Sequence, residues 1–195
     1  NFDNLKHHLK EELKIEDNAI IWLHIGLKGL GKIRENNINV ITDCFESALN
    51  SGSLIIPTFT YSWCKNEIFE NKKTECKEVG FYNNLAWRDK RFKRTKNPNF
   101  SVAIMDNSSN QEVYKKLIKP NTVNTCFGEG SIFDEIRKLS ENLPSYIMLL
   151  GGAHDDVIFR TTFLHYIEEK ISVPYRYKKK FYSPIDSSQY ITQYV

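Results

Sequence analysis

Short apolar runs along the chain alternate with segments in which apolar residues recur every three or four positions. The runs have the length of buried strands, and they lie at residues 19–25, 54–56, 101–105 and 146–150. The spaced segments are typical of amphipathic helices, and they lie at residues 5–13, 38–48, 111–118, 132–139 and 160–171. Such an alternation predicts an α/β protein.

Residues 19–57 hold a strand, a glycine-rich turn, a helix that Asn36 or Asn37 can cap, and a second strand. Such a unit favours parallel strands joined by a right-handed crossover. Residues 58–100 lose regular periodicity, which indicates long functional loops with one short helix near 82–87. Ser131 and Asp134 resemble a capping box at the start of the helix that follows. The tail, residues 176–195, is expected to add one or two edge strands.

The stretch from 145 to 177 holds the strongest candidate for a site. Its buried strand stops at Gly151, a polar loop follows, and a helix with Phe163, Ile167 and Ile171 as its buried stripe carries His165 and Glu168. Residues three apart share one face of a helix, so the imidazole and the carboxylate are expected side by side. Ligand chemistry in α/β proteins gathers at the carboxyl ends of the strands, so a functional site is expected here.

Composition narrows the class of protein. The 195 residues fit one domain over 1–195, and 41% hydrophobic and 26% charged residues are ordinary for a globular chain. A net charge of +3 without a long basic stripe argues against nucleic acid as a partner. The sequence has no apolar stretch long enough for a membrane span. Its four cysteines form no C-x-x-C pair, which indicates reduced thiols and a cytoplasmic location.

Several candidate residues have more than one interpretation. The turn at 26–31 could offer backbone N–H groups to a phosphate, or it could be a plain tight turn. The basic and aromatic segment at 87–96 could grip an anionic cofactor or lie in solvent. His24, inside an apolar strand, is most simply a core histidine with a hydrogen-bonded ring. His165 could form a surface pair with a carboxylate, act as a general base, or join His154, Asp155 and Asp156 around a metal.

The order of the motifs resembles the aminoglycoside 3-N-acetyltransferase (antibiotic N-acetyltransferase) family. The resemblance covers about residues 18–182, and no single motif is diagnostic. The matching pieces are Leu23-His24-Ile25-Gly26-Leu27 with Leu30-Gly31, Ile56-Pro57-Thr58-Phe59-Thr60-Tyr61-Ser62-Trp63, Arg94-Thr95-Lys96-Asn97-Pro98-Asn99-Phe100-Ser101, Cys126-Phe127-Gly128-Glu129-Gly130-Ser131, Leu149-Leu150-Gly151, and Thr162-Phe163-Leu164-His165-Tyr166-Ile167-Glu168.

The resemblance implies transfer of an acetyl group from acetyl-CoA to an amine of an aminoglycoside or another amino sugar, and a surface-glycan precursor is an equal candidate. The acid–base chemistry of such a transfer requires no metal. The resemblance also implies a three-layer α/β/α sandwich around a mostly parallel or mixed sheet, unrelated to the GNAT acetyltransferases. His165 resembles the general base, with Glu168 as its partner and Thr162 as an aid to the oxyanion. The implied cofactor contacts are His24, Gly26, Leu27, Gly29, Leu30, Gly31, Arg94 and Ser101. A cationic acceptor would also need carboxylates nearby, and Asp155, Asp156 and Glu169 are candidates because they lie near His165 in sequence; Tyr61 is a further candidate contact.

Two departures from the family keep alternatives open. Ile25 and Gly26 stand where the family usually has Ser or Thr, so a phosphate contact there would need backbone N–H groups. The family's chains also continue some tens of residues beyond Val195, so the domain is expected to be incomplete at its C-terminus. A homodimer is one option for the assembly. The alternative functions are a non-catalytic member that binds CoA or a partner chain, and a metal-dependent hydrolase.

Overall fold

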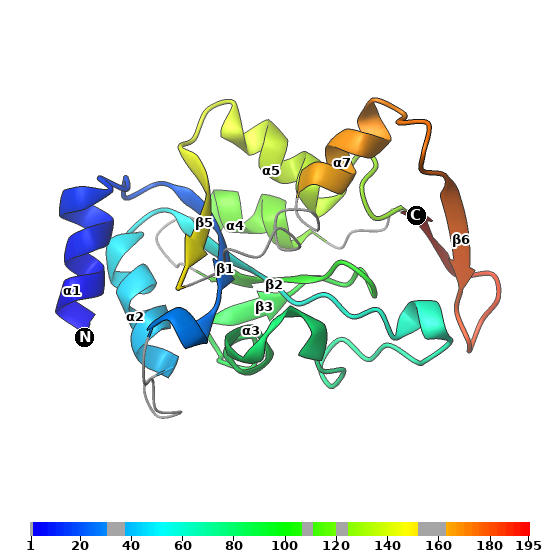
Figure 1. The fold of residues 1–195 in the computed structure, drawn as a ribbon, viewed down its shortest axis with the longest axis horizontal. Coiled ribbons are helices and arrows are strands. Elements are labelled where there is room, and N and C mark those ends of the chain that lie inside the picture. The colour runs from blue at the N-terminus through cyan, green and yellow to red at the C-terminus, as the bar shows by residue number, and fades with distance from the viewer. Residues whose placement is uncertain (1, 31–37, 107–110, 120–124, 152–162) are drawn as a thin grey trace.

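A five-stranded mixed sheet forms the centre of the molecule (Figure 1). The computed structural model describes residues 2–30, 38–106, 111–119, 125–151 and 163–195. The strand order across the sheet is β3-β4-β2-β1-β5. The strands are β1 (Ile20–Ile25), β2 (Ser53–Pro57), β3 (Phe92–Arg94), β4 (Val102–Met105) and β5 (Ser145–Leu150).

The parallel part of the sheet comes from the expected strand–helix–strand unit. β1 pairs in parallel with β2, opposing Ile20 to Ser53, and α2 (Ile38–Ala48) lies between them in sequence. β5 adds a third parallel strand on the other side of β1. β4 and β3 continue the sheet beyond β2 in antiparallel register. β1 and β5 therefore end together, beside Gly26 and Gly151.

Helices cover both faces of this sheet, which confirms the three-layer sandwich. Successive residues of β1 point to opposite faces, so Ile21 enters one core and Trp22 the other. The first face carries α1 (Phe2–His7), the π-helical turn His8–Glu12, α2 and α3 (Phe81–Ala86). The second face carries α4 (Gln111–Ile118), α5 (Ile132–Ser140) and α7 (Phe163–Lys170). Short 3-10 turns lie at Leu27–Leu30, Trp63–Lys65 and Lys77–Val79.

Two burial predictions were wrong. β5 is not a buried strand, because β1 is its one strand partner among the described residues and Ile147 is 48% exposed. The predicted stripe on α7 also fails, since Ile167 and Ile171 are 49% and 67% exposed. The helix packs instead through Phe163 and Tyr166, and the Phe163 ring meets the rings of Trp22 and Phe133 at 5.5 Å each. The aromatic residues of α7, and not its aliphatic ones, therefore face the second core.

The predicted cap of α5 is confirmed. The Ser131 hydroxyl accepts a hydrogen bond from the backbone N–H of Asp134 at 3.2 Å. The Asp134 carboxylate reaches back to the N–H of Gly130 at 3.0 Å, one residue earlier than in a standard capping box. A second anchor links the Tyr166 hydroxyl to Asp134 at 3.1 Å. The start of α5 is therefore tied to α7.

The tail forms a separate antiparallel pair and not an edge of the main sheet. Its strands are β6 (Lys178–Tyr182) and β7 (Tyr190–Tyr194). The backbone N–H of Cys126 donates to the Thr192 carbonyl at 3.0 Å, which ties this hairpin to the chain before α5.

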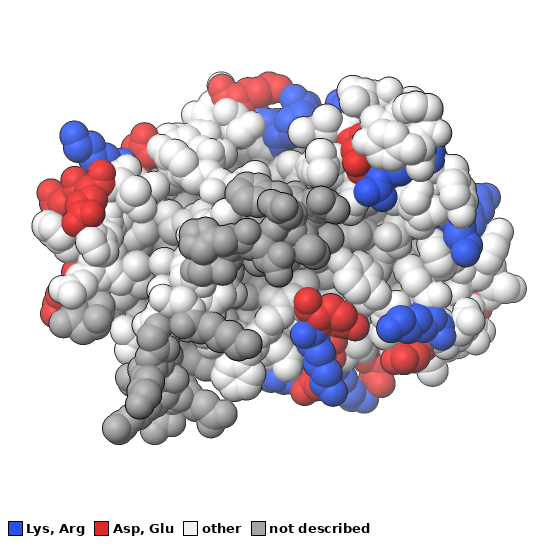
Figure 2. All heavy atoms as spheres, in the orientation of Figure 1, with Lys and Arg blue, Asp and Glu red and all other residues white. Residues whose placement is uncertain are grey.

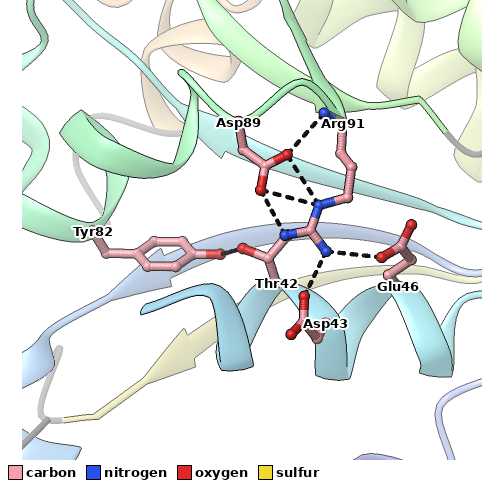
Figure 3. Close-up of polar contacts among 6 residues, drawn as sticks. All are labelled: Thr42, Asp43, Glu46, Tyr82, Asp89 and Arg91. Atoms are coloured by element: carbon pink, nitrogen blue, oxygen red, sulfur yellow. Dashed lines mark hydrogen bonds and ion pairs between the residues drawn. The ribbon is translucent and has the colours of Figure 1, made fainter. Parts of the chain in front are cut away.

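An ion cluster fixes the first helical layer against the sheet (Figure 3). The Arg91 guanidinium contacts Asp43 at 2.6 Å and Glu46 at 2.8 Å, both on α2, and Asp89 at 2.6 Å on its own segment. Beside it, the Tyr82 hydroxyl on α3 shares a 3.0 Å hydrogen bond with Thr42. The aperiodic segment before β3 is thereby held in place by α2.

The molecular surface in Figure 2 carries basic and acidic side chains interspersed around its rim. This mixture agrees with the small net charge of +3. Within the described residues, none of the helices has both the length and the apolar character needed to cross a bilayer.

Candidate active site

His165 and Glu168 form a hydrogen-bonded pair on α7. The distance between His165 Nδ1 and Glu168 Oε2 is 2.8 Å, and the two side chains are 13% and 7% exposed. The imidazole also lies against the ring of Phe127, with the ring centres 5.8 Å apart. The three-residue spacing seen in the sequence thus produces a largely buried pair rather than a surface contact.

Glu168 has two further partners, which the sequence did not reveal. The Tyr175 hydroxyl donates to Glu168 Oε1 at 3.2 Å. Arg176 Nε lies 2.7 Å from Oε2, although its N–H is not aligned for a hydrogen bond, so the contact is an ion pair. Burial tends to raise the pKa of Glu168, but the hydrogen bond from His165 and the charge of Arg176 together hold that pKa below its usual value. Glu168 is therefore a carboxylate at neutral pH.

A carboxylate at Nδ1 decides what the imidazole can do. A neutral ring that donates its Nδ1 proton to Glu168 keeps its lone pair on Nε2. That nitrogen can take a proton from a substrate, and the carboxylate then favours the cationic ring. The pair is thus equipped for general-base chemistry.

Glu169, expected at the acceptor site, lies next to this pair. Its carboxylate forms an ion pair with Lys178 at 2.8 Å. It lines a cavity of about 350 Å³, together with Phe127, Gly128, Glu129, Asp134, Arg137, Lys138, Lys170 and Lys178. Because both acidic and basic groups surround this space, its charge alone does not select a cationic ligand.

His24 is a core histidine, as its position in an apolar strand indicated. Trp22 Nε1 donates a hydrogen bond to His24 Nε2 at 3.0 Å in the sheet interior. Burial lowers the pKa of His24 to about 4, so its ring is neutral at physiological pH. Its predicted cofactor contact stays a prediction.

The glycine-rich turn is a short 3-10 helix packed on the end of β5. The N–H of Gly26 donates to the Leu150 carbonyl at 2.8 Å, and the N–H of Gly29 donates to the Gly26 carbonyl at 3.1 Å. Gly151 has a φ of +68° and fits so closely that a Cβ would lie 2.5 Å from Leu30 Cγ. Two of the N–H groups considered for a phosphate therefore have internal partners. Leu27 and Leu30 belong to the same turn, whereas Gly31 lies outside the described residues.

Arg94 and Ser101, expected at the cofactor, are engaged within the fold. Arg94 Nε donates to Ser101 Oγ at 3.0 Å, and Nη2 donates to the Thr58 carbonyl at 2.7 Å. The guanidinium also lies over the rings of Phe69 and Trp87, 5.1 and 4.8 Å from their centres. These contacts give both side chains a role in joining β3 to the loop after β2. Their cofactor contacts stay predictions.

The remaining predicted residues divide into two groups. Tyr61 is described and packs edge-on against Phe100, with ring centres 6.0 Å apart. Thr162, His154, Asp155 and Asp156 lie outside the described residues. In the part of the chain that the structure describes, no group of three or more His, Cys, Asp or Glu side chains could hold a metal ion.

Comparison with solved structures finds the same fold in aminoglycoside acetyltransferases. AAC-VIa, solved with sisomicin bound, is 14% identical with a TM-score of 0.75; the match covers 100% of this chain and 76% of that one. AAC(3)-IVa, solved as apoenzyme, is 17% identical with a TM-score of 0.70, over 99% of this chain and 69% of that one. AAC-IIIb, solved with CoASH, is 14% identical with a TM-score of 0.70, over 100% and 75% of the two chains.

A search of curated protein sequences returns no match. The family model described as aminoglycoside 3-N-acetyltransferase, however, matches residues 22–193. That range includes the His165–Glu168 pair, most of the C-terminal hairpin and the five strands of the main sheet. Of these strands, only the first two residues of β1 lie outside it. The chain therefore belongs to the aminoglycoside 3-N-acetyltransferase family, a family of acyltransferases.

Proposed function

We propose that this protein transfers the acetyl group of acetyl-CoA to an amine of an aminoglycoside or another amino sugar. The observation that carries the proposal is the 2.8 Å contact between His165 and the buried carboxylate Glu168, inside a chain of this family. An amine attacks a thioester only as its lone pair becomes available, and a neutral imidazole can accept the proton it loses.

The reaction is a direct transfer. The amine nitrogen bonds to the acetyl carbon while His165 Nε2 accepts the nitrogen's proton. The thioester oxygen becomes an oxyanion, for which we propose the Thr162 hydroxyl as one donor. The C–S bond then breaks, and the imidazolium returns its proton to the sulfur of CoA. No metal is needed for these steps.

The cofactor is proposed to bind across the carboxyl ends of the parallel strands. The turn Leu27–Leu30 follows the end of β1 there, and a solved relative of the same fold, AAC-IIIb, holds CoASH. Since the N–H groups of Gly26 and Gly29 have internal partners, phosphate contacts at this turn would fall to the other residues of the turn. None of the four cysteines forms a disulfide in the described structure, in keeping with a reaction in the cytoplasm.

The acceptor is proposed to lie beside α7. Glu169 borders a cavity there, and Tyr61, Asp155 and Asp156 are the other proposed contacts. A solved relative of the same fold binds sisomicin. An amino sugar from surface-glycan synthesis fits the same chemistry, because what the site needs is an amine near His165.

A thiol-release assay with a panel of aminoglycosides and amino sugars tests the proposal. CoA release that depends on both acetyl-CoA and an acceptor is expected, together with thermal stabilisation of the protein by CoA. Activity should survive dialysis against a chelator. Stabilisation by CoA without turnover on any acceptor would favour a non-catalytic member. Activity lost to the chelator and restored by zinc would favour a metal-dependent hydrolase.

A further inference from the structure

Arg176 is held beside the His165–Glu168 pair by two elements at once. In the turn after α7, the backbone N–H of Val173 donates a hydrogen bond to the Glu168 carbonyl at 3.2 Å. On its other side, Tyr177 exchanges backbone hydrogen bonds with Val195 at 3.0 and 2.9 Å, where the C-terminal hairpin begins. The position of the Arg176 backbone therefore follows from helix and hairpin together.

The guanidinium and the imidazole share one carboxylate oxygen. Glu168 Oε2 lies 2.8 Å from His165 Nδ1 and 2.7 Å from Arg176 Nε. Because the Arg176 N–H is not aligned along its contact, the hydrogen bond at Oε2 belongs to His165, while Arg176 supplies charge. The Arg176 side chain is 25% exposed, so its charge is only partly screened by water.

We propose that Arg176 is a positioning residue for the acyl transfer. It keeps Glu168 ionised and directed at His165 Nδ1, and it limits how strongly that carboxylate stabilises the protonated ring. A carboxylate without a neighbouring cation would hold the imidazolium more tightly, so the base would stay protonated to higher pH. Arg176 thereby offsets part of the attraction between Glu168 and a protonated ring. This inference rests on the proposed role of His165 as the base.

The other charged and titratable groups around the pair are few within the described residues. Tyr175, in the same turn, donates to Glu168 Oε1, and the Tyr194 hydroxyl from β7 donates to the Val173 carbonyl at 3.0 Å. Glu169, next on α7, is neutralised by Lys178 of β6. Arg176 is thus the one cation that the described residues place on Glu168 besides the imidazole itself.

The test compares Arg176→Met with Arg176→Lys in kcat/KM against pH, with one acceptor throughout so that the acceptor amine contributes equally. In Arg176→Met, the rising part of the curve of kcat/KM against pH should move to higher pH by roughly half to one unit. At any pH below the midpoint of that rise, kcat/KM is then about 3- to 10-fold lower than in the parent protein. Arg176→Lys should restore most of the parent profile. Lys116→Met, which removes a cation from an exposed ion pair with Glu112 on α4, is the control and should leave the profile in place.

A purely structural role gives a different result. If Arg176→Met lowers kcat/KM by the same factor at every pH, with no shift of the rising part of the curve, the proposal is overturned. A shift that is still present in Arg176→Lys would also overturn it. If the parent protein shows no acetyl transfer, the imidazole of His165 can be titrated directly by NMR in parent and Arg176→Met. A higher midpoint in the variant would then still support the inference, although the proposed function had failed. An unchanged midpoint would reject it.

Discussion

Two histidines on neighbouring elements show how one residue type takes on opposite tasks. His24 lies in β1, inside the sheet, and its Nε2 accepts a hydrogen bond from the Trp22 indole. His165 lies on α7, over the second face, and its Nδ1 contacts the carboxylate of Glu168. A neutral donor at the ring makes protonation costly, whereas a carboxylate makes it favourable.

These two rings have a similar exposure but different hydrogen-bond partners. Both are largely buried, at 8% exposure for His24 and 13% for the His165 side chain. The pKa of His24 is lowered to about 4 by burial, so it stays neutral and supports the core. His165 has a buried anion to compensate the charge that a general base acquires. The following predictions test this contrast.

Replacing the proposed base should have the largest effect. His165→Ala is expected to lower the acetylation rate roughly 10²–10⁴-fold, the usual contribution of a positioned general base. The affinity for CoA should hardly change, because the imidazole acts on the acceptor amine. The thiol-release assay measures the first effect and CoA-dependent thermal stabilisation the second. A large loss of CoA binding would show that the ring contacts the cofactor instead.

The core histidine should make folding stability depend on pH. The pKa of His24 is about 4 in the folded protein and ordinarily about 6.5, so the unfolded chain binds the proton more strongly. The contribution of the neutral His24 ring to the free energy of unfolding is complete above about pH 6.5. As the pH falls toward about 4, the free energy of unfolding decreases by about 3 kcal/mol in all. Urea unfolding of the parent and of His24→Gln across this range measures it. Parallel curves for the two proteins would contradict the account.

Removing the indole partner of His24 should cost stability. Trp22→Phe keeps an aromatic ring but leaves the buried Nε2 of His24 without this donor, which costs about 1–3 kcal/mol in addition to any loss of packing. Trp63→Phe is the matched control, because Trp63 is also buried and its indole N–H has no acceptor among the described residues. Urea unfolding should show the greater loss for Trp22→Phe. Equal losses would mean that packing alone matters.

Neutralising the partner of His165 should have a smaller effect than removing the base. Glu168→Gln can still accept a hydrogen bond from Nδ1 but no longer favours the cationic ring, so a loss of about tenfold in kcat is expected. The ascending limb of the pH profile should also move to lower pH, because the protonated ring is less favoured. Glu112→Gln, an exposed ion-pair carboxylate on α4, serves as the control. A limb that moves to higher pH would contradict this assignment.

The positions of most helices and strands could be predicted from the sequence. The parallel β1–α2–β2 unit, the helix at 111–118 and the Ser131 cap were predicted, because each depends on local spacing or local hydrogen bonding. Which faces of these elements are buried was harder to predict. The edge position of β5 depends on which strands pair with it, and an apolar run carries no information about that. The orientation of α7 follows from rings on β1 and α5 that meet Phe163.

Of the candidate site, only the part that lies on α7 could be predicted from the sequence. The spacing of His165 and Glu168 predicted their contact, since both lie on one helix. Arg176 reaches the same carboxylate through a turn and a hairpin whose geometry no periodicity specifies. The internal partners of Arg94 come from three separate loops and strands, which explains why a motif alone suggested a cofactor contact.

The most direct test of the central claim is the acetyl-transfer rate of His165→Asn and His24→Asn measured side by side. Both rates are taken per folded molecule, at saturating substrates and at a pH where the parent rate has levelled off. The account predicts that His165→Asn loses at least about 100-fold, whereas His24→Asn stays within about tenfold of the parent and loses mainly stability. Near-parent turnover by His165→Asn, or the greater loss in His24→Asn, would contradict the assignment of His165 as the base.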